Sequence, residues 1–511
     1  MTFHSVLYPR PEPDRLAADG AMPEFFRDLS LDRIVAAVTA GRDEYALQAF
    51  FYRRLDDPEA IVYRQEVMRD LEDPELFARI GAFAEQMREM RSHLRAAAER
   101  PYRLNRQGWF LEAVAIYCAA VERLRADLAQ AALQARGLRE FRDYLSHSVA
   151  APPFRALVAD TARVRSALGS IHYCILIRDN AVTVRPYRDE ADYSAEIAAS
   201  FVKFRRGDAR DYRVKFPDLG GMNHVEAQIL EMVAKLHPEV FADLESYCEK
   251  YKNFIDPVLQ RFDREIQFYM AYLQYIDRFR RAGLAFCYPE VSQRTKEIFA
   301  DQTFDLALAE ELASENTPVV VNDFFLQGEE RVLLVSGPNS GGKTTFARTI
   351  GQLHHLASLG CPVPGTRARL FLCDRIFTHF ERQESLENLR GKLQDDLLRM
   401  RRILAAATPN SLLIINEIFS ATALQDALFL ATGVMERILA LGCLCVCVTF
   451  LDELAALAAA IASMVSTVVP DDPARRTFKL VRRPPDGRAY AMAIAEKYRL
   501  TYRALRERLA R

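Results

Sequence analysis

The spacing of apolar residues predicts long helices over residues 24–300. Apolar positions recur there at steps of three and four, the repeat of one face of an α-helix. One stripe, with Gly137 beyond it as a stop signal, consists of Leu111, Val114, Cys118, Val121, Leu124 and Leu128. A second stripe predicts a helix from Pro257 to Arg281, ended by Gly283, and consists of Phe262, Ile266, Tyr269, Leu273 and Ile276. This region is therefore expected to be mostly helical.

Other apolar patterns predict strands. Residues 171–187, IHYCILIRDNAVTVRPY, place β-branched and aromatic residues around Asp179 and Asn180, which predicts one small β hairpin. From Pro318 onward, apolar strands alternate with helical segments, a pattern typical of a mostly parallel sheet. An alanine-rich helix is expected at 455–462. The predicted fold class is therefore α plus α/β, with a boundary near residue 300.

The strongest chemical signal is a glycine-rich loop. The predicted strand Val332–Val335 leads into GPNSGGKTT, which matches the nucleotide-binding pattern G-x-x-x-x-G-K-[ST] between a strand and a helix. Backbone N–H groups of such a loop surround a phosphate at the helix N-terminus, a lysine neutralises the β and γ oxygens, and a hydroxyl binds magnesium. The predicted nucleotide-binding residues are Gly337, Pro338, Asn339, Ser340, Gly341, Gly342, Lys343, Thr344 and Thr345.

A second candidate element is the segment SLLIINEIFSAT, residues 411–422. Its apolar run predicts a strand buried on both faces. After this strand, enzymes that hydrolyse nucleotides through such a loop place an aspartate that holds magnesium, and here the residue is Asn416. The amide oxygen of Asn416 can accept a hydrogen bond from a magnesium-bound water, but it brings no charge. We therefore assign Thr344 and Asn416 to the metal, and Lys343 and Glu417 to catalysis. A plain surface acid at a strand end is the alternative for Glu417.

These segments and their neighbours resemble the ATPase domain of the MutS family. The chain reads VVVNDFFL before the loop and LASLGCPVPGTRARLFLCDRIFTHF after it, in the order and spacing of that family. The matching residues are Asn322, Asp323, Asn339, Val363, Pro364, Asp374, Arg375, Ile376, Phe377 and Thr378. The resemblance implies a P-loop ATPase domain of the ABC type that uses ATP and Mg²⁺. It also implies a homodimer formed through the ATPase domains and a DNA partner recognised by structure rather than sequence.

Several positions depart from the family pattern. Gly391 stands where the family has the serine that caps the partner's γ-phosphate in ABC-like dimers, Asp396 replaces a glutamate, and Phe450 replaces the switch histidine. The residues that are kept after the acidic strand are Glu417, Thr422 and Asp426. Because Asn416 also lacks the charge of the usual aspartate, slow ATP turnover is expected.

The N-terminal half resembles the core and lever helices of the family more weakly, through YALQAFFYRRLDDPEAIVYRQEV and AFCYPEV. We expect an N-terminal extension at 1–44, a helical, clamp-like core and lever region at 45–300, and the ATPase domain at 301–511. The stretch before Tyr45 is too short for the family's mismatch-recognition domain, which is expected to be lacking. Residues 201–216 mix basic and aromatic side chains, and are interpreted either as a DNA contact or as a solvated loop.

Composition limits the function classes. Lys and Arg total 68 against 69 for Asp and Glu, so the formal net charge of −1 gives no general attraction to polyanions. The N-terminus has no apolar signal segment, and the run Ile438–Leu451 is too short to span a bilayer, so a cytoplasmic protein without membrane contact is expected. The nine cysteines form no C-x-x-C pair. Cys443, Cys445 and Cys447 would share one strand face, where packing is favoured over a soft metal.

Two function hypotheses follow. The first is a MutS-like, DNA-dependent ATPase that acts as a nucleotide-gated clamp or switch on DNA in repair or recombination, slowed by Asn416. The alternative is a binding module that keeps ATP as a conformational ligand, hydrolyses little of it and acts on a protein or RNA partner. His354 and His355 have no carboxylate or cysteine at ligand spacing, so they are given no chemical role.

Overall fold

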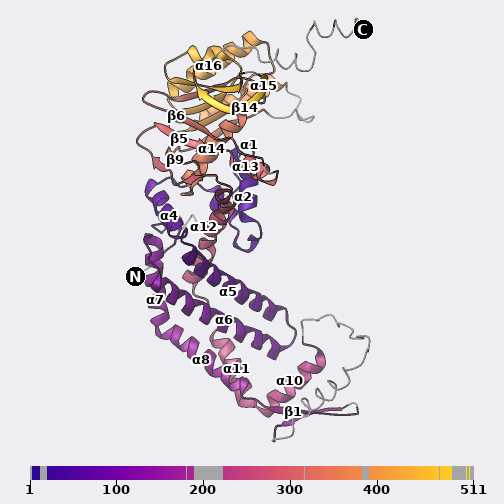
Figure 1. The fold of residues 1–511 in the computed structure, drawn as a ribbon. Coiled ribbons are helices and arrows are strands. Elements are labelled where there is room, and N and C mark those ends of the chain that lie inside the picture. The colour runs from indigo at the N-terminus through magenta and orange to yellow at the C-terminus, as the bar shows by residue number, and fades with distance from the viewer. Residues whose placement is uncertain are drawn as a thin grey trace. The chain divides into compact units, whose positions relative to one another are not determined.

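The computed structural model describes residues 3–11, 20–179, 181–188, 222–315, 317–381, 391–470 and 472–485, together with Tyr502 and Arg506. Over these residues the chain combines helices and sheets (Figure 1). It separates into two compact units. The first consists of Met1–Phe3, Asp73–Leu133 and Arg139–Asp263, and the second of His4–Glu72, Gln134–Leu138 and Arg264–Arg511. The expected domain boundaries at 44/45 and 300/301 stay predictions.

The first unit is built from long helices and one hairpin. Its elements are α5 (Pro74–Glu99), α6 (Arg103–Gln130), α8 (Pro152–Gly169), β1 (Tyr173–Arg178), β2 (Ala181–Pro186), α10 (His224–Leu236) and α11 (Pro238–Lys250), and it shares α7 (Arg136–Ala150) and α12 (Pro257–Arg281) with the second unit. The hairpin is confirmed, because β1 pairs antiparallel with β2 from Tyr173 opposite Pro186 onward. The helix predicted from Pro257 to Arg281 is also confirmed.

The stop predicted at Gly137 is wrong. Helix α6 ends at Gln130, because the next residue, Ala131, is extended with ψ 139°. Gly137 lies instead in the first turn of α7. A side chain there would place its Cβ 2.6 Å from the Tyr63 hydroxyl oxygen. This glycine is therefore explained by close packing against Tyr63 rather than by the end of a helix.

The second unit carries the larger sheet. Its remaining elements are α1 (Phe25–Asp28), α2 (Leu31–Thr39), η1 (Asp43–Tyr45), α3 (Gln48–Tyr52), α4 (Pro58–Asp70), β3 (Phe286–Cys287), β4 (Glu290–Ser292), β5 (Ile298–Thr303), α13 (Leu306–Ser314), β6 (Asn322–Leu326), β7 (Val332–Ser336), α14 (Lys343–Ser358), β8 (Val363–Pro364), β9 (Arg367–Phe371), β10 (Ile376–His379), α15 (Lys392–Ala406), β11 (Leu412–Asn416), α16 (Leu424–Leu441), β12 (Leu444–Val448), η2 (Asp452–Ala456), β13 (Ile461–Val469) and β14 (Asp472–Arg482). The helix expected at 455–462 is wrong, since η2 ends at Ala456 and a strand begins at the β-branched Ile461.

The six-stranded sheet is mostly parallel, as predicted. Its order is β10-β11-β12-β7-β13-β14, and every neighbouring pair is parallel except β13 with the edge strand β14. All five residues in each of β7, β11 and β12 are buried. On one face, Leu413 and Ile415 share a core cluster with Met435 and Ile438 of α16. Helix α14 contacts β11 and β12, so these strands have no face open to water.

The cysteine triplet belongs to this core. Cys443, Cys445 and Cys447 are buried within the same apolar cluster. Burial raises the pKa of Cys443 to about 11 and that of Cys447 to about 12, so both thiols stay protonated. In the part of the chain that the structure describes, no group of three or more His, Cys, Asp or Glu residues could hold a metal ion. The triplet therefore serves packing.

The segment before residue 72 is integrated with the sheet. The Asp28 carboxylate of α1 accepts a hydrogen bond of 2.6 Å from the Thr378 hydroxyl of β10. The same oxygen accepts one of 2.9 Å from the Arg399 guanidinium of α15. These bonds join the N-terminal segment to the sheet. Separately, none of the described helices has the length and apolar character needed to span a bilayer.

Two helical glycines give a matched test of this packing. A Cβ at Gly351 of α14 would lie 2.5 Å from Ile414 Cδ1 and 2.6 Å from Leu29 Cδ1, whereas a Cβ at Gly433 of α16 would meet no atom within 4 Å. Overpacking typically costs about 1–3 kcal/mol, and replacing an exposed helical glycine by alanine gains up to about 1 kcal/mol. Gly351→Ala should therefore lower the midpoint of thermal unfolding and Gly433→Ala should not. Equal midpoints would contradict the close approach of α14 to β11.

Candidate functional site

The glycine-rich loop joins the end of β7 to the start of α14. Two of its glycines have positive φ, 113° at Gly337 and 88° at Gly342, which side chains rarely adopt. Space is limiting as well, because a Cβ at Gly341 would lie 2.3 Å from the Ser466 hydroxyl oxygen of β13. Instead, this hydroxyl donates a hydrogen bond of 2.7 Å to the Gly341 carbonyl. Strand β13 therefore holds the loop in a tight turn at the N-terminus of α14.

Lys343 folds back over this loop. Its Nζ donates to the Gly337 and Pro338 carbonyl oxygens, each at 3.0 Å, and lies 3.4 Å from Asn339 Oδ1. Burial lowers the pKa of the ammonium, and the positive charge of Arg476 adds to that shift. Free N–H groups at the start of α14 lie beside this cation. Together they form a positive environment suited to an anion.

The predicted metal residues are brought together. Thr344 Oγ1 donates a hydrogen bond of 2.8 Å to Asn416 Oδ1 at the end of β11. The next residue, Glu417, has a left-handed backbone with φ 55°, and its N–H donates to the Val448 carbonyl at 2.9 Å. Glu417 reaches the cavity that the loop borders.

That cavity has a volume of about 610 Å³ and a mixed lining. Loop residues 339–345 and Glu417 line it, together with polar residues that include Thr303, Asp305, Thr317 and Asn322. Apolar side chains also line it, and those we call the apolar wall are Leu308, Leu312, Pro318, Val319, Val320 and Phe478. Of the predicted site residues, Gly337 and Pro338 contact Lys343 through their carbonyls, and Asn416 contacts Thr344, without lining the cavity. The remaining ones line it.

Strand β14 supplies residues that the sequence did not identify as part of the site. Asn322 Nδ2 donates to the Phe478 carbonyl at 3.0 Å, and its Oδ1 accepts from the Leu480 N–H at 2.8 Å. Phe478 between these bonds has φ 59° and lies at the cavity. Arg476 Nε donates to the Asn339 carbonyl of the loop at 3.0 Å. The pairing of β13 with β14 and the bonds from Asn322 place them here, so no local sequence signal could have found them.

The other positions singled out in the sequence take separate places. Gly391 is the exposed N-cap of α15, Asp396 lies 3.6 Å from His379 Nε2, and Phe450 is exposed. His354 and His355 are buried, which lowers the pKa of each to about 4 and keeps both neutral. The basic and aromatic stretch 201–216 lies outside the described residues.

Comparisons with known proteins find similar sequences for the region that carries the loop and Glu417. Residues 333–504 match the model of MutS domain V. The chain is 27% identical over 226 residues to the DNA mismatch repair protein MutS of Thermotoga maritima, covering 44% of this chain and 27% of that protein. It is 33% identical over 189 residues to Endonuclease MutS2 of Thermus thermophilus, covering 37% of this chain and 25% of that protein. The matched stretches thus span about a quarter of these relatives. The glycine-rich loop and Glu417 therefore lie in the part of the chain that matches MutS domain V, and the chain is similar to MutS and MutS2 proteins over its C-terminal region.

Proposed function

We propose that this chain binds ATP with Mg²⁺ in the cavity beside the glycine-rich loop, hydrolyses it slowly, and acts as a nucleotide-gated clamp or switch on DNA. The observation that carries the proposal is the convergence of Lys343, Thr344, Asn416 and Glu417 on one loop. They come from β11 and α14, yet the Thr344 and Asn416 side chains meet at 2.8 Å.

The residues present fit a nucleoside triphosphate. The loop needs glycine at Gly341, where a Cβ would lie 2.3 Å from Ser466 Oγ, and this leaves backbone N–H groups free to donate to phosphate oxygens. Lys343 would exchange its bonds with loop carbonyls for bonds with the phosphates. The apolar wall of the cavity suits the face of a base. The loop therefore suits the triphosphate, and the apolar residues of the cavity suit the base.

The positions of Thr344 and Asn416 suit a bound Mg²⁺, but these two residues supply no negative charge to it. A bound Mg²⁺ would neutralise charge on the phosphates. Thr344 Oγ1 would hold the ion and Asn416 Oδ1 would accept from one of its waters. Because Asn416 is neutral, the site has one negative charge fewer than an aspartate would provide. Glu417 would orient and deprotonate the attacking water. This arrangement supports binding with slow hydrolysis.

DNA is the partner that the relatives favour. The two relatives named above are described as a DNA mismatch repair protein and an endonuclease. With a net charge of −1, DNA contact in this chain would have to come from a local basic surface. Residues 201–216 remain our candidate for it. A protein or RNA partner remains the alternative if DNA has no effect on nucleotide turnover.

The first test is binding and turnover of ATP. The wild-type chain should bind ATP with Mg²⁺, and Lys343→Ala should weaken binding by tenfold or more, because a charge-assisted contact is worth about 1.5–3 kcal/mol. Calorimetry measures affinity, and phosphate release with and without duplex DNA measures turnover. No binding at millimolar ATP would contradict the site. An ATP turnover rate that does not change when duplex DNA is added would contradict the proposed dependence of hydrolysis on DNA.

The second test concerns Asn416. Asn416→Asp keeps the acceptor for Thr344 and adds the missing charge, so turnover should rise by about 10- to 100-fold for about 1.5–3 kcal/mol of extra stabilisation. Adding Glu417→Gln to this variant should abolish turnover and leave ATP binding intact. An unchanged rate in Asn416→Asp would mean that this position does not limit hydrolysis. Such a result would favour a binding switch.

We also propose that ATP stabilises a homodimer formed through the ATPase domains, with residues 391–396 at the interface. An isologous pairing would place each such segment at the partner's nucleotide. Sedimentation with a non-hydrolysable ATP analogue should show a dimer. Gly391→Ser should strengthen it, since a Cβ at Gly391 meets no atom within 4 Å and the added hydroxyl could reach a phosphate. A monomer in both proteins would contradict this assembly.

A further inference from the structure

Two residues of the apolar wall, Leu308 and Leu312, depend on how α13 begins. Asp305 is the N-cap of this helix, and its Oδ1 accepts a hydrogen bond of 3.0 Å from the Leu308 N–H. Leu308 and Leu312, one turn apart on α13, line the same cavity as the glycine-rich loop. The position of the first turn of α13 therefore sets where these two side chains lie in the cavity.

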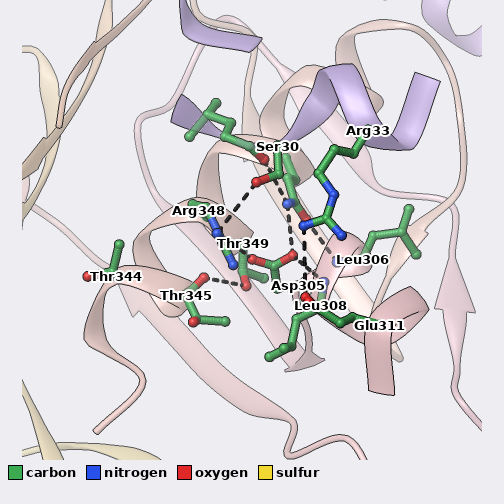
Figure 2. Close-up of polar contacts among 12 residues, drawn as sticks. Ser30, Arg33, Asp305, Leu306, Leu308, Glu311, Thr344, Thr345, Arg348 and Thr349 are labelled. Atoms are coloured by element: carbon green, nitrogen blue, oxygen red, sulfur yellow. Dashed lines mark hydrogen bonds and ion pairs between the residues drawn. The ribbon is translucent and has the colours of Figure 1, made fainter. Parts of the chain in front are cut away.

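Helix α14 fixes that first turn through two side chains. Arg348 Nε donates to Asp305 Oδ2 at 2.8 Å. Gln352 donates from Nε2 to Asp305 Oδ1 at 3.0 Å and accepts the Leu306 N–H at 2.9 Å. Figure 2 shows the Asp305 carboxylate between Arg348 and the start of α13. The Asp305 side chain is 0% exposed, so its carboxylate oxygens bond to these partners rather than to solvent.

The same two residues also reach the N-terminal segment. Gln352 Nε2 donates to the Leu29 carbonyl at 2.9 Å, and Arg348 Nη1 lies 3.4 Å from Ser30 Oγ. Leu29 and Gln352 are 323 positions apart in the chain. Arg348 and Gln352 follow Thr344 at intervals of four on α14, so they project from nearly the same side of the helix as that loop residue. Arg348 and Gln352 thus connect the loop helix, the first turn of α13 and the turn between α1 and α2.

We propose that Asp305 and Arg348 are positioning residues of the nucleotide site, which hold α13 against the nucleoside part of the ligand. This inference rests on the proposed ATP binding. The phosphates contact the loop, which α14 and β13 hold independently of α13. The base and ribose contact the apolar wall, of which Leu308 and Leu312 move if the pair is broken. The pair therefore sets affinity for the nucleoside and leaves affinity for the phosphate chain unchanged.

The test compares ATP with inorganic tripolyphosphate, both with Mg²⁺. Asp305→Asn can keep a carbonyl oxygen that accepts from the Leu308 N–H. The group facing Arg348 then becomes an NH2 group, which cannot accept, or a neutral oxygen, which accepts more weakly than a carboxylate. This substitution should weaken ATP binding by tenfold or more and change tripolyphosphate binding by less than twofold. Arg348→Lys keeps the charge but loses the planar guanidinium donors. It should weaken ATP binding by about threefold and change tripolyphosphate binding by less than twofold.

Glu311→Gln is the matched control. Glu311 lies on the same helix and pairs with Arg33 at 3.8 Å, but both side chains are more than half exposed (Figure 2). Exposed pairs contribute little, so both ligands should bind this variant as they bind the wild type.

The outcomes separate the two claims. A wild-type protein that binds neither ligand would refute the proposed nucleotide site itself. A wild type that binds both, with ATP affinity unchanged in folded Asp305→Asn and in Arg348→Lys, would refute the positioning role alone. Equal weakening of both ligands would also refute it, because the pair would then act on the loop. If Asp305→Asn does not fold, the ligand split in Arg348→Lys decides.

Discussion

Parallel pairing of β7, β12 and β11 is the constraint on which the site depends. Parallel strands end at the same edge of a sheet, so the loop after β7 and the residues after β11 meet there although β12 lies between the strands. Asn416 pairs with Val448, and Val448 with Val335, at this edge. The bond from Thr344 to Asn416 follows from that register. Apolar packing on both faces keeps the register in place.

Polar contacts then position individual parts of the site that the sheet brings together. Ser466 holds the loop tightly, Asn322 fixes Phe478 at the cavity, and Asp305 begins the helix that carries Leu308 and Leu312 of the apolar wall. These three residues position other parts of the site, and they do so without contacting a phosphate. The neutral Asn416 fits the same scheme, because it preserves a hydrogen bond within the site and alters only charge. Its predicted effect is therefore on hydrolysis more than on architecture.

Local patterns predicted the long helix from Pro257 to Arg281, the hairpin, the parallel sheet and the residues of the loop, because each depends on neighbours in sequence. They failed at Gly137, because this glycine is explained by close packing against Tyr63, which is distant in sequence. They also failed at 455–462, where the alanine content indicated a helix but Ile461 begins a strand that pairs with β7. Arg348 and Gln352 look like ordinary polar helix positions in the sequence. Their buried partners come from segments brought together only by the fold.

Hydrogen exchange of the backbone with and without ATP and Mg²⁺ tests the central claim most directly, which is that ATP occupies the cavity between the loop and α13. Bound ligand slows the opening of the segments that contact it. ATP near its wild-type Kd should therefore slow exchange at residues 337–349 and 306–314, and it should slow exchange less in Lys343→Ala at that ATP concentration. Unchanged exchange in both segments at saturating ATP, or equal slowing in the wild type and in Lys343→Ala, would contradict the account.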